Sequence, residues 1–142
     1  MIDFMAAEED IVAILKNPLS AVISDSTYPT EGNPHPRVYG TFARIIQHFV
    51  VEKEALTLPK AVEKMTSAPA KALRLQGKGV IAPGMDADLC VFTPEKVREM
   101  GTYTHPRQLA QGVDTVLVAG QIAWEQGRMT ACRAGKVVKR DA

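Results

Sequence analysis

A short apolar run at residues 19–24 (LSAVIS) constrains the fold of this chain more than any other feature. The run lacks helical periodicity, Pro18 precedes it and a turn-rich loop follows it, so the pattern predicts a buried strand. A buried strand needs hydrogen-bonding neighbours on both of its edges. The segments around it predict helices instead, so the sequence looks like part of a larger fold.

Three segments around this run have the pattern of helices. Residues 8–17 open with two acids and stop before Pro18, with Ile11, Ile14 and Leu15 on one face. A second helix is expected from Thr41, because five apolar residues recur at helical spacing: Phe42, Ile45, Ile46, Phe49 and Val50. A third is expected from Thr57, with Pro69 breaking it and residues 70–73 adding another turn.

The local sequence pattern changes at Gly77. From there on, turn residues become frequent, and the segments between them favour strands. Strands are expected at residues 87–92, 114–120, 121–126 and 136–139, with a hairpin turning at Ala119-Gly120. The shift suggests two regions, residues 1–76 with helices and residues 77–142 with short strands.

Composition excludes several classes of protein. The 142 residues carry a net charge of +1, so the chain has no electrostatic footprint for nucleic acid or an anionic membrane. No apolar run is long enough to span a bilayer, and the first residues do not resemble a signal peptide. Cys90 lies in an apolar run and is expected in the core, while a disulfide with Cys132 is the lesser reading. A cytoplasmic location is therefore expected.

The loop after residue 24 places an acid, a histidine and an arginine close together, as Asp25, His35 and Arg37. Loops held by a scaffold carry functional residues more often than packed elements do. From spacing alone, Asp25 could instead bind backbone groups of the loop, and Arg37 could be a solvated surface residue.

Four stretches together resemble a known family: "HPRVYGTF", "LTLPKAVEKMTSAPAKAL", "GKGVIAPGMDADLCVF" and "VLVAGQIAWEQGRMTACRAGKVVK". They are similar to the C-terminal part of N-acyl-D-amino-acid deacylases (D-aminoacylases), members of the amidohydrolase superfamily. The resemblance implies an α/β fold, namely the C-terminal end of a metal-dependent (β/α)8 barrel followed by strands of a small β-sandwich. Residues 19–24 would be the last barrel strand and residues 41–73 the helices after it, with the barrel incomplete in this chain.

The same resemblance implies roles for the loop residues. The aspartate matching Asp25 binds the metal and acts as general acid and base, taking a proton from water and passing it to the leaving amine. The arginine matching Arg37 holds the substrate α-carboxylate, a task suited to a planar bidentate donor. His35 is assigned to the substrate side of the site, and Asp88 to a structural role through backbone contacts. His48 and His105 lack metal-ligand spacing.

The departures from the family pattern concern zinc. A zinc hydrolase site needs about three or four protein ligands, yet this chain has no His-x-His and retains only Asp25 of the metal set. Zinc is therefore expected in the complete family enzyme and not in this chain alone, which should be inactive on N-acyl-D-amino acids unless a complementary barrel fragment completes it.

Two other functions remain open from the sequence. The chain could be a non-enzymatic module that self-associates through surfaces left uncovered by the missing barrel. A weaker reading is an anion-binding protein that uses Arg37 and a basic C-terminal group: Arg133, Lys136, Lys139 and Arg140.

Overall fold

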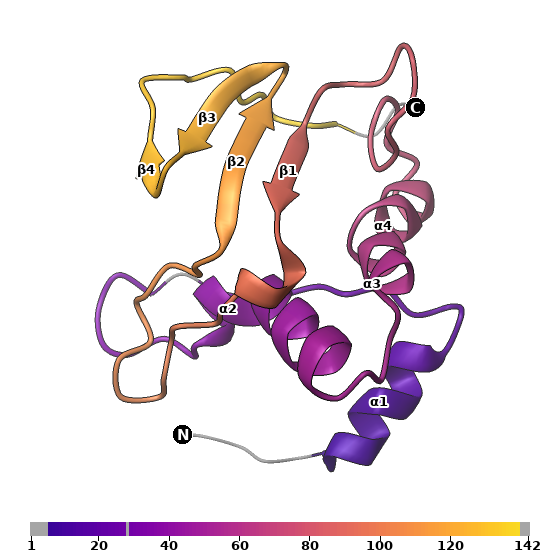
Figure 1. Ribbon diagram of the computed structural model, residues 1–142, viewed down its shortest axis with the longest axis vertical. Coiled ribbons are helices and arrows are strands. Elements are labelled where there is room, and N and C mark those ends of the chain that lie inside the picture. Colours follow the sequence, from indigo (N-terminus) through magenta and orange to yellow (C-terminus); the bar gives the residue numbers. More distant parts are fainter. Residues whose placement is uncertain (1–5, 28, 140–142) are drawn as a thin grey trace.

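The computed structural model describes residues 6–27 and 29–139. Helices from the first half of the chain lie along one side, and a four-stranded antiparallel sheet from the second half lies on the other (Figure 1). Ten elements follow in order: α1 (Glu8–Lys16), α2 (Arg37–Arg44), the π-helix η1 (Ile45–Glu52), α3 (Leu58–Met65), α4 (Ser67–Ala72), β1 (Leu89–Phe92), the 3-10 helix η2 (Pro94–Lys96), β2 (Val113–Val118), β3 (Gln121–Glu125) and β4 (Arg128–Met129).

The helix α1 is confirmed, but its apolar face is only partly covered. Three acids fill its first turn, and Asn17, the residue before Pro18, is its C-cap. Leu15 is buried, whereas Ile14 is 62% exposed and Ile11 is also exposed. The described residues therefore cover one edge of the face that the sequence predicts to be apolar.

The strand expected at residues 19–24 is wrong. The segment is extended, and Val22 is buried while Ile23 is exposed, but the part of the chain that the structure describes places no strand beside it. The amide of Val22 instead donates to the carbonyl of Lys64, at 3.0 Å. A strand requires a hydrogen-bonding neighbour, and a single bond to the end of α3 does not replace one.

The second helix begins earlier than expected. It starts at Arg37, after Pro36, whose φ of −53° already lies in the helical region. Thr41 therefore lies inside the helix, where its hydroxyl donates to the carbonyl of Arg37 at 2.8 Å. From Ile45 the helix continues with the wider turns of a π-helix to Glu52.

The third helix begins where the sequence predicts. Thr57 is its N-cap, and the Thr57 hydroxyl accepts a hydrogen bond from the amide of Lys60. The helix breaks at Thr66, three residues before Pro69, and Pro69 lies in the first turn of α4. A proline is tolerated there because the amides of a first helical turn have no partner within the helix.

The sheet has the strand order β1-β2-β3-β4 and turns where glycine allows it. Ala119 and Gly120 have φ values of 49° and 77°, which confirms the expected hairpin between β2 and β3. A second tight turn at Gln126 and Gly127 (φ 51° and 77°) produces β4.

Two expectations for the second half are wrong. Residues 136–139 do not form a strand, because nothing in the described chain pairs with them, and Val137 is 86% exposed. Cys90 is exposed rather than in the core, because none of the described residues forms a second layer over β1. Cys90 and Cys132 are both free thiols.

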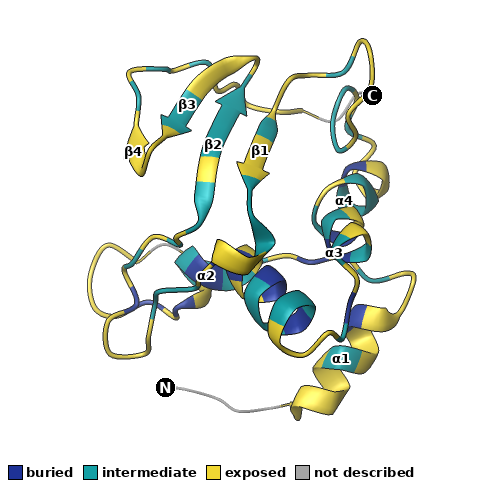
Figure 2. Ribbon diagram, viewed as in Figure 1, coloured by how far each residue is buried: buried dark blue, intermediate teal, exposed yellow. Residues whose placement is uncertain are grey.

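The core lies almost wholly among the helices. Figure 2 shows buried residues along the helices and none on the strands. The buried cluster is Leu15, Val22, Ala43, Ile45, Ile46, Phe49, Leu56, Ala61 and Val97. Among the described residues, no helix is long and apolar enough to cross a membrane.

Candidate active site

Asp25 lies in the extended segment after α1, in an unusual backbone conformation. Its φ is 47°, in the left-handed region that aspartate tolerates better than most residues. The Asp25 side chain is 78% exposed, and its Oδ2 lies 3.2 Å from Nη2 of Arg37. The ion pair joins this segment to the first residue of α2.

His35 fixes the start of α2. Its Nδ1 accepts a hydrogen bond from the amide of Arg37 at 3.1 Å, so the ring takes the place of a capping side chain. An accepting Nδ1 leaves the proton on Nε2, which lies 3.4 Å from the Tyr103 hydroxyl. The two rings also meet edge to face, with centroids 5.2 Å apart. His35 therefore connects α2 to the segment around residue 103.

The surroundings of His35 favour the neutral ring. Partial burial lowers the pKa of His35, and the positive charge of Arg37 lowers it further, while Glu99 opposes both effects. A neutral ring is what the hydrogen bond to the Arg37 amide requires, because an imidazolium has no accepting nitrogen.

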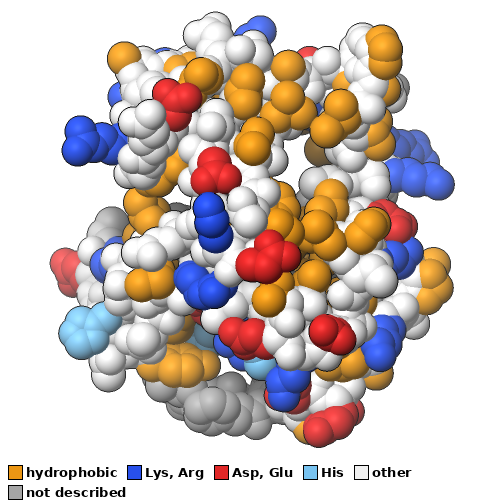
Figure 3. Space-filling view, viewed as in Figure 1, with side chains coloured by type: hydrophobic (Ala, Val, Ile, Leu, Met, Phe, Trp, Pro, Cys, Tyr) orange, Lys and Arg blue, Asp and Glu red, His pale blue; other side chains and the backbone are white. Residues whose placement is uncertain are grey.

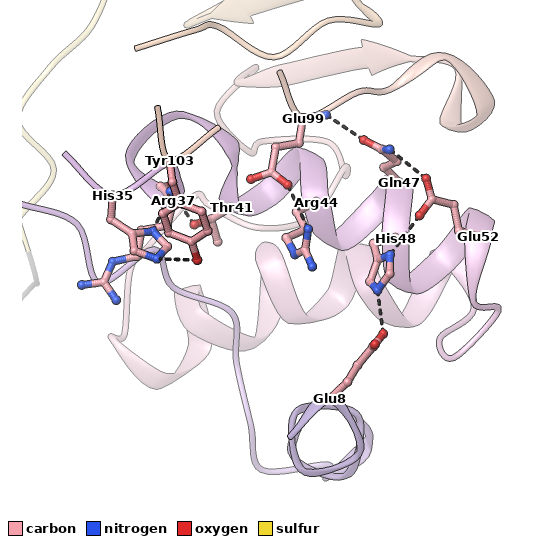
Figure 4. A network of polar contacts seen from close by, with 10 residues as sticks. All are labelled: Glu8, His35, Arg37, Thr41, Arg44, Gln47, His48, Glu52, Glu99 and Tyr103. Atoms are coloured by element: carbon pink, nitrogen blue, oxygen red, sulfur yellow. Dashed lines mark hydrogen bonds and ion pairs between the residues drawn. The ribbon is translucent and has the colours of Figure 1, made fainter. Parts of the chain in front are cut away.

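A second wall of the site comes from residues 98–109, which the sequence analysis missed. Glu99 pairs with Arg44 of α2 at 3.2 Å, and the amide of Glu99 donates to Gln47 of η1 at 2.8 Å (Figure 4). Arg107 donates to the carbonyls of Pro29 and Gly32, at 2.9 and 3.2 Å, and so holds the loop before His35.

One signal in the sequence could have indicated this wall. The tripeptide His-Pro-Arg occurs twice, at residues 35–37 and 105–107. Both prolines are buried, and a Cβ on Gly101 would lie within 3.5 Å of Pro36 and 3.0 Å of the Pro106 carbonyl. The two tripeptides therefore pack close together, although 70 positions separate them.

The other two histidines make different contacts. His48 bridges two carboxylates: its Nε2 is 2.6 Å from Glu8 and its Nδ1 is 2.9 Å from Glu52, and these three residues are called the histidine cluster. His48 lowers the pKa of Glu8; Gln47 and then His48 lower that of Glu52. His105 contacts the Thr104 hydroxyl at 3.1 Å.

Asp88 has the structural role that the resemblance implies. Its Oδ1 accepts a hydrogen bond from the amide of Ala119 at 2.8 Å, and its other oxygen pairs with Lys78. Lys78 also pairs with Asp86 at 2.8 Å, and Lys78, Asp86 and Asp88 are called the lysine cluster. Lys78 and then the Ala119 amide lower the pKa of Asp88. The cluster fastens the loop before β1 to the β2–β3 turn.

The described residues do not by themselves fit a zinc site. They include no group of three His, Cys, Asp or Glu side chains that could hold a metal ion. Asp25 offers one exposed carboxylate, and its nearest charged partner is a cation, Arg37. The structure thus brings Asp25, His35 and Arg37 together, and the roles expected for them stay predictions.

Comparison with known proteins identifies the family of this chain. The amidohydrolase family matches residues 8–124. The chain is 37% identical to a D-aminoacylase of Alcaligenes xylosoxydans xylosoxydans, over 98% of this chain and 28% of that protein. An N-acyl-D-aspartate deacylase of the same organism is 36% identical over 95% of this chain and 27% of its own length. The chain therefore spans less than a third of these relatives.

Two solved structures show the same fold in longer chains. A crystal structure of D-aminoacylase, described as defining a novel subset of amidohydrolases, aligns with a TM-score of 0.90 and 37% identity, over 96% of this chain and 29% of that one. An N-acyl-D-glutamate deacylase from Bordetella bronchiseptica, complexed with zinc and a phosphonate mimic of the tetrahedral intermediate, aligns with a TM-score of 0.80 and 34% identity, over 86% and 26%. The chain belongs to the amidohydrolase family.

Proposed function

We propose that this chain is the carboxyl-terminal part of a zinc-dependent N-acyl-D-amino-acid deacylase and forms one wall of its active site. The observation that carries the proposal is the 3.2 Å contact between the Asp25 carboxylate and the Arg37 guanidinium, two groups that amide hydrolysis of such a substrate would use. The similarity to deacylases of N-acyl-D-amino acids and N-acyl-D-aspartate supports it.

Arg37 would bind the carboxylate of the substrate. Its guanidinium is 44% exposed, and its backbone is held at the start of α2 by the His35 ring. A planar guanidinium can offer two parallel N–H groups to a carboxylate, which orients the substrate as well as binding it. The pairing with Asp25 shows that this guanidinium is accessible to a carboxylate.

Asp25 would move the proton. A carboxylate can accept a proton from the attacking water and then donate it to the leaving nitrogen. The C–N bond then breaks, and the leaving group departs as a neutral amine. The 78% exposure of its side chain leaves Asp25 accessible to a substrate.

The remainder of the site would come from polypeptide that this chain does not contain. In the family relative solved with zinc, this chain corresponds to 26% of the length. The described part of the second half also has no covering layer over its sheet, since the strands bury none of their residues. We propose that a complementary barrel fragment supplies both the covering layer and the remaining zinc ligands.

Reconstitution tests this proposal. The purified chain would be assayed with zinc for hydrolysis of N-acetyl-D-methionine, alone and mixed with the part of the Alcaligenes D-aminoacylase that it does not match. We expect turnover only in the mixture, with Asp25→Asn lowering the rate about a hundredfold or more and Glu31→Gln, in the same exposed loop, leaving it unchanged. Equal turnover by the Asp25→Asn mixture would refute the role of Asp25.

One observation favours a second function, a self-associating module without activity. Several large apolar side chains are exposed, among them Leu19 at 94% and Ile81 at 89%. On the face in Figure 3, hydrophobic side chains gather between the sheet and the α3–α4 helices. A stable homo-oligomer in solution that does not dissociate when the barrel fragment is added would favour this module over the enzyme part.

A further inference from the structure

Lys64 of α3 is a buried charged residue. The residue is 1% exposed, and its Nζ donates to three oxygens of the segment after α1. These are the carbonyl of Asn17 at 2.6 Å, the carbonyl of Ser20 at 3.0 Å and the hydroxyl of Ser20 at 2.8 Å. None of the three is a carboxylate, so the charge is held entirely by neutral oxygens.

The hydrogen-bond directions require an ammonium group. The Ser20 hydroxyl donates its own proton to the carbonyl of Ile14, at 2.6 Å, so it can only accept from Lys64. The three acceptors therefore match the three N–H donors of the ammonium, and no donor is left without a partner. The site also lies at the C-terminal end of α1, where the helix dipole favours a positive charge.

Lys64 holds the same segment a second time through its backbone. Its carbonyl accepts the amide of Val22, at 3.0 Å, and the Val22 side chain is buried in the core. The segment from Asn17 to Val22 is therefore fixed to α3 at four hydrogen bonds from one residue. Asp25 follows Val22 by three positions and has the left-handed φ of 47°. A strained conformation of this kind persists only where the surrounding structure holds it.

We propose that Lys64 is a positioning residue for Asp25. It holds the chain on the N-terminal side of the left-handed turn, while Arg37 holds the Asp25 carboxylate on the other side. Its importance for catalysis rests on the proposed function, but its structural action does not. Burying an ammonium is costly unless its donors have hydrogen-bond partners, and here three oxygens of the segment accept from it. These bonds form only when the segment lies in this position, so Lys64 specifies where the segment lies.

Replacement by an apolar side chain of similar length tests the anchor. In Lys64→Met, we expect amide exchange at Val22 to rise about tenfold more than at Leu56, whose amide bonds to Phe49 in the same core. The amide signals of Asp25 and Ser26 should shift with it. Lys60→Met is the matched control, because Lys60 lies one turn earlier on α3 with its side chain 38% exposed. It should change none of these signals.

A milder variant covers the case in which Lys64→Met does not fold. Ser20→Ala removes one of the three acceptors and keeps the ammonium, so we expect the same local loosening at Val22, about threefold. Equal acceleration at Val22 and Leu56 in both variants would mean that Lys64 contributes to overall stability alone, and the proposal would be overturned. Absence of any local change in Ser20→Ala would also overturn it.

The reconstituted enzyme separates this proposal from the proposed function. Displacement of Asp25 should lower kcat in Lys64→Met and leave KM within about twofold, because the backbone of Arg37 is held at the start of α2 by the His35 ring and not by Lys64. A mixture that is inactive even with the natural sequence would contradict the proposed function, while exchange and amide shifts in the isolated chain would still decide the role of Lys64.

Discussion

The helical region (residues 6–76) and the sheet region (residues 77–139) are stabilised by different interactions. Among the described residues, the core cluster draws all its members from the helical region except Val97, which follows η2. The sheet region contributes no buried residue from any strand. A helix completes its main-chain hydrogen bonds locally, so a few helices can enclose a core, whereas a sheet needs a second layer to bury a face.

The sheet region relies instead on main-chain pairing, tight turns and polar anchors. The pairing runs from β1 to β4, with register shifts at Val91/Phe92 and at Val116/Leu117. Asp88 of the lysine cluster accepts a hydrogen bond from the amide of Ala119. Such bonds fix geometry but bury little apolar surface, and burial supplies most of the free energy of folding. The sheet region should therefore depend on a covering partner more strongly than the helical region does.

The largest expected effect tests where the core lies. Phe49 is 4% exposed, so Phe49→Ala should lower the free energy of unfolding by about 3–5 kcal/mol. Val91, on β1, is 51% exposed, so Val91→Ala should cost about 0.5 kcal/mol or less. Urea titration followed by circular dichroism measures both. Similar losses of unfolding free energy in the two variants would contradict the conclusion that the core lies in the helical region and not in the sheet region.

A second prediction compares two glycines of the sheet region, one closely packed and one open. Gly112 and Gly127 have similar φ values, 84° and 77°, but a Cβ on Gly112 would lie 2.1 Å from the Lys96 carbonyl, while nothing lies within 4 Å at Gly127. Gly127→Ala should cost about 1–2 kcal/mol from its backbone conformation alone. Gly112→Ala should cost clearly more, because backbone must move. Thermal unfolding of the two variants gives the comparison, and equal costs would contradict the close approach of Gly112 to the main chain of Lys96.

The smallest expected effect concerns pH. Both clusters hold carboxylates, Glu8, Glu52 and Asp88, whose pKa is lowered in the folded chain. Each contributes stability above its unfolded pKa, and that contribution is lost as the pH falls through the folded value. Protection of amides in α1 and at Ala119 should therefore both fall at acidic pH.

On the alkaline side the lysine cluster should keep its ion pairs. Asp86 and then Asp88 raise the pKa of Lys78 above its ordinary 10.5, so the contribution of Lys78 to stability is fully present below that value. Between pH 6 and 9, amide exchange at Ala119, corrected for its intrinsic rate, should therefore stay constant. Acceleration at Ala119 in this range would contradict the anchoring role of the lysine cluster.

Local chemistry accounts for what the sequence predicts correctly. The cap at Thr57 and the turn at Ala119-Gly120 depend on a few adjacent residues, and both are found where expected. The strand at residues 19–24 fails because its partners are not in the described chain, although the alternation of buried Val22 and exposed Ile23 is there. The π-helix has no distinct sequence pattern, so residues 45–52 read as an ordinary helix.

The candidate site also combines residues that the sequence predicts with residues that only the folded chain brings together. Asp25, His35 and Arg37 are neighbours in sequence, and the resemblance to D-aminoacylases identifies them together. Tyr103 reaches His35 across 68 positions, and only the folded chain brings them into contact. The burial of Lys64 is equally hidden, because a lysine on a helix predicts a solvated position unless the oxygens that surround it are known.

The π-helix η1 sets the rotational phase between the two ends of one continuous helix. Arg37 at the start of α2 faces Asp25, while Phe49 within η1 faces the core. A helix with wider turns advances by a smaller angle per residue, so the part of η1 from Ile45 to Phe49 fixes how those two directions differ. The irregular turns thus determine the direction of Arg37 relative to that of Phe49.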